Sequence, residues 1–312
     1  MSRYRISLYP VLWSHSFAEE HEASKKFDLD LFPNTLELYE WLSSTCLLSE
    51  TQLKRHVLRH GATAFLPLGV MQKDLRLGMS QVNIDGCGVD LVFPSFFWVG
   101  MQPPEKSKTS PTTYAERMAL PVIWRGSTSG TFGNPFNGEV FAAHRIRLAT
   151  LMARSKLMDA KIYEIVTFDN ANGEEIMRNY LEEHEAMGNY VQGNEAFEYQ
   201  MVLDVDGNTW SSRLPKLFWS DTLVLRASSF ANFMDGHYIK AYVHYLPVRL
   251  DFSDLEDKIR WAMANPDRVD EIRANVRRDF PQSEKALYDF MTCYGQQLLL
   301  EYSCLVFDKC DA

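Results

Sequence analysis

From residue 119 onward, short apolar runs alternate regularly with amphipathic stretches, and this alternation limits the folds open to the chain. Short apolar runs bounded by turn residues predict strands, whereas apolar residues at every third or fourth position predict helices. We predict strands at 121–124, 160–167, 197–203, 222–226 and 242–248. We predict helices at 141–158, 174–186, 212–219, 253–264, from Pro266 onward and at 283–307. Strands and helices that alternate in this way indicate a parallel α/β sheet.

The first 118 residues show the alternation of apolar runs and amphipathic stretches less clearly. The apolar runs 64–70 and 89–93 predict two buried strands, and the polar segment 101–118, which carries three prolines, predicts a linker or exposed loop. A chain of 312 residues is long enough for two domains of ordinary size. We therefore predict a first domain over 1–118, a second over 119–282 and a terminal helical segment over 283–312.

The net charge and the cysteine content argue against several classes of protein. The formal net charge of −9 argues against nucleic-acid binding, because that binding relies on lysine and arginine at phosphates. The five cysteines include no Cys-x-x-Cys pair, so neither a disulfide scaffold nor a structural zinc site is expected. No apolar run has the length of a signal-peptide core or of a membrane span. We expect a soluble protein of a reducing compartment such as the cytoplasm.

Two segments place small polar residues and an arginine directly after a predicted strand. They are IWRGSTSG, residues 123–130, and DVDGNTWSSRLP, residues 204–215. Ligands of parallel α/β sheets bind at the carboxyl ends of the strands, where small residues let backbone N–H groups approach a phosphate. An arginine adds a planar fork that matches phosphate oxygens. We predict that Arg125 and Arg213 bind one diphosphate together.

Each segment also has a purely structural interpretation. Gly-Ser-Thr-Ser-Gly is an ordinary loop composition, Asp206 and Gly207 fit a tight turn, and Ser211 or Ser212 fits a helix N-cap. A calcium-binding EF-hand loop is excluded, because glycine falls at the fourth position and not at the sixth. The chain has no P-loop and no Gly-x-Ser-x-Gly elbow, so kinase and serine-hydrolase chemistry lack support.

Five segments, in order, resemble glycosyltransferase family 90, the group of protein O-glucosyltransferases, protein O-xylosyltransferases and fungal capsule-associated xylosyltransferases. Residues 89–100 resemble the family's Asp-[Ile/Leu]-x-[Phe/Tyr]-Pro segment, and residues 123–130 its Trp/Phe-Arg-Gly-Ser motif. Residues 144–160 resemble its arginine-rich helix and the Asp-Ala that follows. Residues 198–225 are similar to its Tyr…Asp-Gly-x-x-x-Ser-x-Arg stretch, and residues 242–265 to its aromatic-His-Tyr-x-Pro-Val segment.

The resemblance implies a GT-B fold, in which two Rossmann-like domains face a central cleft and the C-terminal helix crosses back to the first domain. The first domain would contact the acceptor, and the second would bind the UDP-sugar. It implies transfer of xylose or glucose from UDP-xylose or UDP-glucose, with inversion, without a tightly bound cofactor and without an obligatory metal ion. The acceptor would be a hydroxyl of a glycan or a protein.

The same resemblance implies roles for individual residues. Arg125, Gly126 and Ser127 would line the donor cleft, while Ser211, Ser212 and Arg213 would meet the diphosphate. Asp206 and Gly207 would turn the chain into place, and His244 and Tyr245 would lie near the cleft. Arg213 is the first candidate for stabilising the leaving UDP, because a metal-free mechanism needs cations and helix N–H groups for that task.

Two departures from the family pattern leave alternatives open. The family's Asp-x-Pro, which supplies the catalytic base, is absent; Asp74 is the nearest candidate, followed by Asp85 and Asp90. A non-catalytic nucleotide-sugar or carbohydrate-binding descendant is therefore one alternative. A second is a metal-dependent glycosyltransferase that uses the Asp-x-Asp pair Asp204 and Asp206. The other departure is the lack of a secretion signal, since eukaryotic members usually act in the secretory pathway.

Overall fold

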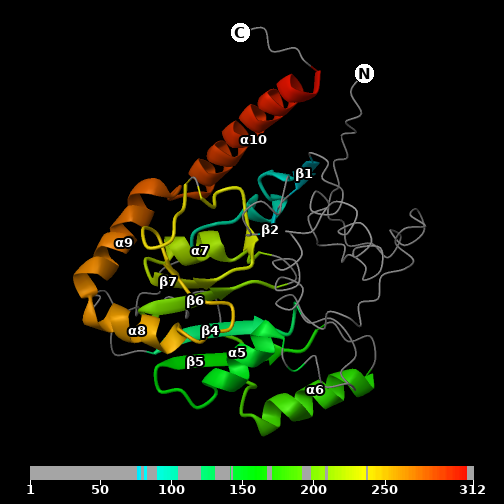
Figure 1. The fold of residues 1–312 in the computed structure, drawn as a ribbon, viewed down its shortest axis with the longest axis vertical. Coiled ribbons are helices and arrows are strands. Elements are labelled where there is room, and N and C mark those ends of the chain that lie inside the picture. Colours follow the sequence, from blue (N-terminus) through cyan, green and yellow to red (C-terminus); the bar gives the residue numbers. More distant parts are fainter. Residues whose placement is uncertain are drawn as a thin grey trace, which may run out of the picture.

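A five-stranded parallel sheet forms the centre of the computed structural model (Figure 1). The structure describes residues 76–78, 81–82, 90–104, 121–130, 141, 143–166, 171–191, 198–207, 210–236 and 238–307. The strand order is β5-β4-β6-β7-β9. The strands are β4 (Val122–Ser127), β5 (Met158–Glu164), β6 (Met201–Val205), β7 (Leu223–Ala227) and β9 (Leu246–Pro247). All four strand pairings are parallel, which confirms the predicted α/β class.

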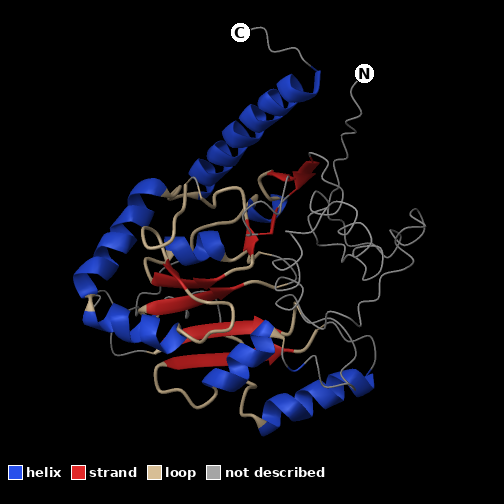
Figure 2. Cartoon of the chain, in the orientation of Figure 1, coloured by secondary structure: helices blue, strands red, loops and turns tan. Residues whose placement is uncertain are grey.

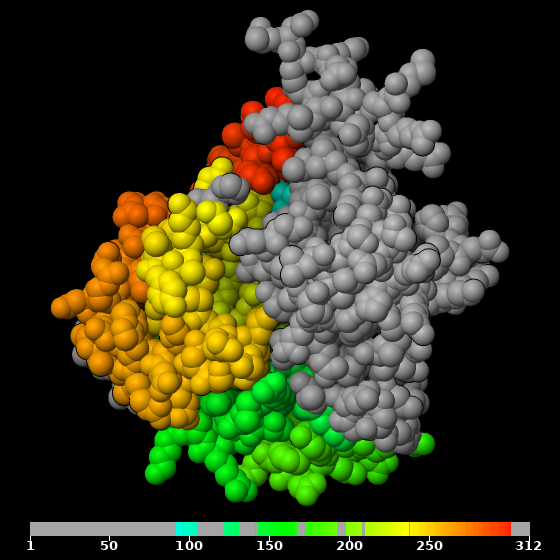
Figure 3. Space-filling view, in the orientation of Figure 1, coloured from blue at the N-terminus to red at the C-terminus, as the bar shows by residue number. Residues whose placement is uncertain are grey.

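Helices cover both faces of this sheet (Figure 2). They are α5 (His144–Met152), α6 (Ala171–Glu183), α7 (Leu214–Trp219), α8 (Leu255–Ala264), α9 (Pro266–Asp279) and α10 (Glu284–Phe307). One face packs against α5, α6 and α8, and the other against α7 and α10. The C-terminal part of the sheet domain, coloured yellow to orange, forms one continuous side of the molecule (Figure 3).

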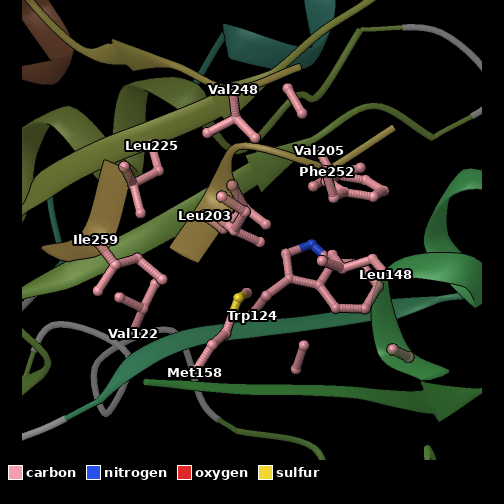
Figure 4. Close-up of a cluster of buried hydrophobic side chains, with 14 of the residues drawn as sticks. Val122, Trp124, Leu148, Met158, Leu203, Val205, Leu225, Val248, Phe252 and Ile259 are labelled. Carbon is pink, nitrogen blue, oxygen red and sulfur yellow. The ribbon is translucent and has the colours of Figure 1, made fainter. Parts of the chain in front are cut away.

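Strand alternation divides the sheet side chains between two apolar cores. Trp124, Leu203 and Leu225 point to the first core, where they meet Ile259 of α8 (Figure 4). Their neighbours, among them Ile123, point to the second core. Such alternation is what a strand dictates, because successive side chains leave a strand on opposite faces. All five residues of β6 are buried, as are all five of β7, so these strands occupy the middle of the domain.

The five strands predicted after residue 119 are present, with shifted ends. The strand predicted at 242–248 contributes only Leu246 and Pro247 to the sheet. The helix predicted at 141–158 is shorter, since α5 ends at Met152. A turn follows, in which the backbone N–H of Ser155 donates to the Met152 carbonyl at 3.0 Å. The predicted helix was too long because the apolar residues Leu157 and Met158 continue its pattern. In the structure Leu157 precedes β5 and Met158 begins it.

The N-terminal half of the expected GT-B architecture lies largely outside the described residues, including the strand predicted at 64–70. Short strands are described there: β1 (Arg76–Gly78) pairs in parallel with β3 (Asp90–Val92), within the strand predicted at 89–93. The strand β2 (Gln81–Val82) pairs antiparallel with β8 (Phe230–Ala231), which follows β7. The parallel sheet domain is the C-terminal half of that architecture.

The terminal helix α10 extends away from the sheet domain (Figure 1). At Gly295 it lies so close to Phe93 that an added Cβ would sit 3.1 Å from the Phe93 ring. The helix therefore contacts the segment that follows β3. The division of the chain at residues 118 and 282 stays a prediction. No helix in the described part of the chain combines the length and apolar character needed to cross a membrane.

Candidate functional site

The loop after β4 and the start of α5 meet through buried polar contacts. Arg145, the second residue of α5, reaches back over the carboxyl end of the sheet and is buried. Its Nη1 donates to Ser129 Oγ at 2.6 Å and to the Ser127 carbonyl at 3.3 Å. Ser127 Oγ in turn donates to Ser129 Oγ at 3.2 Å. The small residues of this loop thus hold an arginine that comes from a different element.

The end of β6 is joined to the same helix through Asp206. The backbone carbonyl of Asp206 accepts hydrogen bonds from His144 Nε2 at 2.7 Å and from Arg145 Nε at 2.6 Å. Burial is the largest cause that lowers the pKa of His144, to about 4, and the Arg145 charge adds to it. His144 is therefore neutral at physiological pH and carries its proton on Nε2.

The carboxylate of Asp206 fixes the turn between β7 and β8. It accepts hydrogen bonds from Ser228 Oγ at 2.8 Å, from the Ser229 backbone N–H at 2.5 Å and from the Phe230 N–H at 3.2 Å. Burial raises the pKa of Asp206 to about 7. One residue thereby connects the end of β6, the start of α5 and the turn that leads to β8.

Two glycines make this close approach of loops possible. Gly130 has φ +85°, and an added Cβ would lie 2.5 Å from both the Gly207 carbonyl oxygen and His144 Cε1. A Cβ at Gly207 would lie 3.1 Å from Arg145 Nη2 and from Ser129 Oγ. Gly130 has no room for a larger residue, and Gly207 would take one only if the Arg145 and Ser129 side chains moved. The predicted turn of Asp206 and Gly207 is therefore packed directly against the loop after β4.

Arg213 reaches the same edge from the segment before α7. Its Nη1 donates to the Arg125 backbone carbonyl at 2.8 Å, and its Nη2 to the Val205 carbonyl at 3.4 Å. Ser211 is buried and accepts from Arg213 Nε at 3.3 Å, whereas Ser212 is exposed. About a third of the Arg213 side chain, 36%, stays exposed. The guanidinium is thus positioned by backbone carbonyls while one side remains open.

The guanidinium groups of Arg145 and Arg213 converge. Arg145 Nη2 donates to the Val205 carbonyl at 3.0 Å, the same oxygen that Arg213 Nη2 contacts. Burial lowers the pKa of Arg145 to about 9, and the Arg213 charge is the second cause. Two cations held this close repel each other, and an anion between them would relieve the repulsion. The carboxyl ends of β4 and β6 therefore carry an arrangement suited to a doubly charged ligand such as a diphosphate.

The predicted side-chain pairing of Arg125 with Arg213 is not what the structure shows. Arg125 lies within β4, and its Nη2 binds Asp159 Oδ2 on β5 at 2.6 Å. Its Nη1 donates to the carbonyls of Trp124 and Asp159, and its Nε to that of Asn189 at 3.2 Å. The Arg125 guanidinium is thus occupied by β5 and the segment beside it, and only the Arg125 backbone carbonyl meets Arg213. Arg145 occupies the place that the sequence assigned to Arg125.

The Asp-x-Asp pair is engaged by the protein on both sides. Asp204 is buried on β6, with Oδ2 3.7 Å from Arg226 Nε and Oδ1 3.7 Å from Arg213 Nη2. Arg226 binds both carboxylate oxygens of Asp235 and lies over the Tyr245 ring at 5.3 Å. Among the described residues, no group of three or more His, Cys, Asp or Glu side chains is arranged to hold a metal ion.

His244 and Tyr245 lie at the start of β9 and serve structural contacts. His244 is buried, with Nδ1 accepting from the Lys240 backbone N–H at 2.9 Å and Nε2 3.0 Å from Asp279 Oδ2. Asp279 is the last residue of α9. The next two residues, Leu246 and Pro247, pair with Leu225 and Arg226, so β9 is level with the carboxyl half of β7. Tyr245 lies one contact from the Asp-x-Asp pair, through Arg226, whereas His244 joins the Lys240 backbone to α9.

The candidate bases are not placed by the structure. Asp74 and Asp85 lie outside the described residues, and Asp90 is described only as the first backbone position of β3. Sequence reasoning missed Arg145 as a site residue, although the segment HRIRL was noted as arginine-rich. The signal that would have found it is its position, since it opens a helix that follows the Gly-Ser loop.

Comparison with known proteins agrees with these features. Residues 86–311 match the family model described as "Glycosyl transferase family 90". Human "Protein O-glucosyltransferase 3" is 28% identical over 186 residues, which cover 58% of this chain and 33% of that protein. Rat "Protein O-glucosyltransferase 1" is 32% identical over 108 residues, covering 34% and 26%. The chain thus matches about a third or less of the length of these relatives.

Solved structures show a weaker likeness. The structure titled "Crystal structure of Anabaena Alr3699/HepE in complex with UDP-glucose" has a TM-score of 0.42 at 14% identity, covering 84% of this chain and 70% of that one. The structure titled "Crystal Structure of TarM" has a TM-score of 0.39 at 13% identity, covering 64% and 38%. At these values the likeness assigns no residue a role.

Proposed function

Because the chain belongs to glycosyl transferase family 90, we propose that it transfers glucose or xylose from a UDP-sugar to a hydroxyl of an acceptor. In this proposal the diphosphate of the donor lies at the carboxyl ends of β4 and β6. The single observation that supports it most is the convergence of Arg145 and Arg213 on the Val205 carbonyl. A preorganised pair of cations, of which Arg213 is partly exposed, is what a departing UDP needs, because negative charge develops on its phosphate as the bond to the sugar breaks.

The two arginines would contribute to diphosphate binding in different ways. Arg213 is partly exposed and can bind phosphate oxygens directly with its planar fork. Arg145 is buried and fixed by four hydrogen-bond acceptors, so it supplies a fixed charge that costs no reorganisation. Ser127 and Gly126 of β4, Gly207 after β6, and Ser211 and Ser212 before α7 complete the proposed donor contacts. Arg125 and Asp206 would hold in place the segments that make these contacts.

We propose an inverting reaction that does not require a metal ion. A carboxylate takes the proton of the acceptor hydroxyl as the hydroxyl oxygen attacks the anomeric carbon, and UDP leaves from the opposite face. Asp74 is the first candidate for this base, and Asp85 and Asp90 are the others. The arginine pair replaces the divalent cation that other glycosyltransferases place on the diphosphate.

The relatives support glucose as the donor sugar and a protein as the acceptor, because the matched proteins carry the name protein O-glucosyltransferase. UDP-xylose stays as the second donor, since it differs from UDP-glucose by a single hydroxymethyl group. A glycan hydroxyl stays as the second acceptor. No tightly bound cofactor is part of the proposal.

The test is a donor-hydrolysis assay with UDP-glucose and UDP-xylose in the presence of a strong chelator. We expect UDP release from one of the two donors and loss of that release in Arg213→Ala. Arg260→Ala on the exposed side of α8 is the matched control, because it also removes a partly exposed arginine. Release that depends strictly on added divalent metal would favour the Asp-x-Asp alternative.

A non-catalytic descendant that binds nucleotide sugar is the second candidate, and the missing Asp-x-Pro motivates it. Asp74→Asn, Asp85→Asn and Asp90→Asn separate the two candidates. If one of these variants loses transfer while UDP still binds with wild-type affinity, the non-catalytic interpretation is wrong. If the wild type binds UDP but hydrolyses neither UDP-glucose nor UDP-xylose, with or without metal, the non-catalytic interpretation holds.

A further inference from the structure

Two tyrosines lie at the outer edge of the sheet, formed by β5. Tyr163 belongs to β5, and Tyr190 ends a short segment that runs along the free edge of that strand. This segment is fixed by backbone hydrogen bonds, from the Ile162 N–H to the Ala186 carbonyl and from the Gly188 N–H to the Ile162 carbonyl, both at 2.9 Å. The bridge between Ile162 and Met187 is parallel, so Tyr190 lies toward the carboxyl end of β5.

A register shift sets Tyr163 apart from its neighbours. Gly126 of β4 pairs with Ile162 of β5, but the next residue, Ser127, pairs with Glu164. Tyr163 is therefore an additional residue in β5, as in a β-bulge. Bulges occur preferentially beside functional sites, where they redirect a side chain. The Tyr163 ring meets the Tyr190 ring edge to face, with centroids 5.0 Å apart, and Tyr190 stays 62% exposed.

Arg125 holds together the two segments that present these tyrosines. Its Nη2 binds Asp159 Oδ2 on β5 at 2.6 Å, and its Nε donates to the carbonyl of Asn189, the residue before Tyr190, at 3.2 Å. A guanidinium with several fixed donors is well suited to such a connection. The arginine of the Arg-Gly-Ser motif thus orders the tyrosine pair.

Tyr163 is the member of the pair that lies nearer the proposed diphosphate position. Ser127, which pairs with Glu164, gives its carbonyl to Arg145 Nη1. Burial is the main cause that raises the pKa of Tyr163, and the charges of Arg213 and Arg145 act against it. The phenol is therefore near enough to both guanidinium groups to sense their charge.

We propose that Tyr163 and Tyr190 form an aromatic subsite that stacks the planar base of the nucleotide donor, and that Arg125 is the positioning residue of this subsite. The inference rests on the proposed function, because the base is tied through its ribose to the diphosphate at Arg145 and Arg213. An exposed aromatic ring is a suitable partner, since stacking of a base on an aromatic side chain contributes measurably to affinity. Tyr190 supplies the open ring, and Tyr163 fixes its orientation.

The experiment is calorimetric titration of the full chain with UDP and, separately, with inorganic pyrophosphate, which has no base. We expect Tyr190→Ala to weaken UDP binding about tenfold and to leave pyrophosphate binding unchanged. Arg213→Ala should weaken both ligands. Tyr242→Ala is the control, because Tyr242 is also an exposed tyrosine, at 56%, and its hydroxyl is bound by Lys258 of α8. It should change neither ligand.

Two further variants separate positioning from general support of the fold. Tyr163→Phe keeps the ring and should keep UDP affinity within about twofold, whereas Tyr163→Leu should weaken UDP alone. Arg125→Ala should weaken UDP but not pyrophosphate, and adding Tyr190→Ala to it should cause little further loss, because both changes remove the same stacking contact.

Three outcomes would overturn the inference. The first is unchanged UDP affinity in Tyr190→Ala. The second is an equal loss for UDP and pyrophosphate, which would make the pair a structural support. The third is a loss confined to UDP-glucose or UDP-xylose with UDP unaffected, which would place the sugar on the ring. If the wild type binds neither UDP nor pyrophosphate, the proposed function itself fails. That result can be told apart from failure of the inference, because it is seen in the wild type and not only in a variant.

Discussion

Arg145 Nη2 and Arg213 Nη2 donate to the same oxygen, the Val205 carbonyl, at 3.0 and 3.4 Å. The two residues come from different elements, α5 and the segment before α7, and they meet where β4 and β6 end. Like charges at this spacing need a nearby anion, and the closest described carboxylate, Asp204, is 3.7 Å from Arg213. The pair therefore gives a chain of net charge −9 a local site suited to an anion.

Asp204 should position Arg213. Its Oδ1 is buried, accepts no hydrogen bond from the described residues, and lies 3.7 Å from Arg213 Nη2. We expect Asp204→Asn to weaken UDP binding about five- to tenfold, a loss of about 1 kcal/mol. The same change in the Arg213→Ala background should have almost no further effect, because the residue that Asp204 orients is gone.

The wild type, Asp204→Asn, Arg213→Ala and the double variant form a double-mutant cycle. Titration of these four proteins with UDP measures the coupling free energy between Asp204 and Arg213. Additive losses would show that Asp204 acts on the fold alone. Arg226 gives an internal check, because it keeps both oxygens of Asp235 when Asp204 is neutral. Unfolding of Asp204→Asn in denaturant should therefore remain a single cooperative transition.

Asp206 should make the protein less stable as pH rises from 4 to 7. Its pKa is about 7 in the folded chain and 3.8 as a free side chain, so in this window the folded state holds a proton that the unfolded state has lost. Relative to Asp206→Asn, the free energy of unfolding of the wild type should fall by up to about 4 kcal/mol across the window. Denaturant titrations at pH 4, 5.5 and 7 measure this difference, and parallel curves for the two proteins would contradict it.

His144 should act in the opposite direction. Its pKa is about 4 in the folded chain and 6.5 when free, so its stabilising contribution is complete above pH 6.5 and declines as pH falls toward 4. Nitrogen-15 NMR of the imidazole should show the neutral form with the proton on Nε2 at pH 7. The signal should not titrate above pH 5. A midpoint near 6.5, or a proton on Nδ1, would mean that the bond to the Asp206 carbonyl is not formed in solution.

Gly130→Ala should destabilise the chain far more than Gly236→Ala. Both glycines have positive φ, +85° and +82°, so both changes carry the same backbone cost of about 1–2 kcal/mol. Only at Gly130 would the new Cβ also collide with the Gly207 carbonyl and His144, which adds about 1–3 kcal/mol. Thermal unfolding of the two variants compares them directly, and equal shifts would show that the two loops are not packed as described.

The sheet could be predicted from the sequence because its signal is local. Strands β4, β6 and β7 are apolar runs ended by polar residues, and each was placed to within a few positions. The site was predicted less well, because the side chains that meet there depend on register between strands. Alternation alone shows that Arg125 and Trp124 leave β4 on opposite faces, but only the pairing of β4 with β5 places Asp159, opposite Ile123, within reach of the Arg125 guanidinium.

Arg145 and His144 illustrate the same limit. A helix that opens with HR predicts an exposed basic turn, whereas both residues are buried by the loops that cross over the start of α5. His244 was predicted near the cleft from motif resemblance, yet the structure uses it to join the Lys240 backbone to α9. Motifs identified the segments that matter, and tertiary packing decided which of their side chains face the site.

The most direct measurement is calorimetric titration with UDP in the presence of a strong chelator, applied to the wild type, Arg213→Ala, Arg145→Lys and the surface control Arg260→Ala. Arg145→Lys keeps the charge but loses the fork that spans Val205, Ser127 and Ser129. We predict that the wild type and Arg260→Ala bind UDP equally, that Arg213→Ala binds it about 10- to 100-fold more weakly, and that Arg145→Lys binds it at least about tenfold more weakly. Wild-type affinity in both site variants would contradict the claim that these two arginines hold the diphosphate.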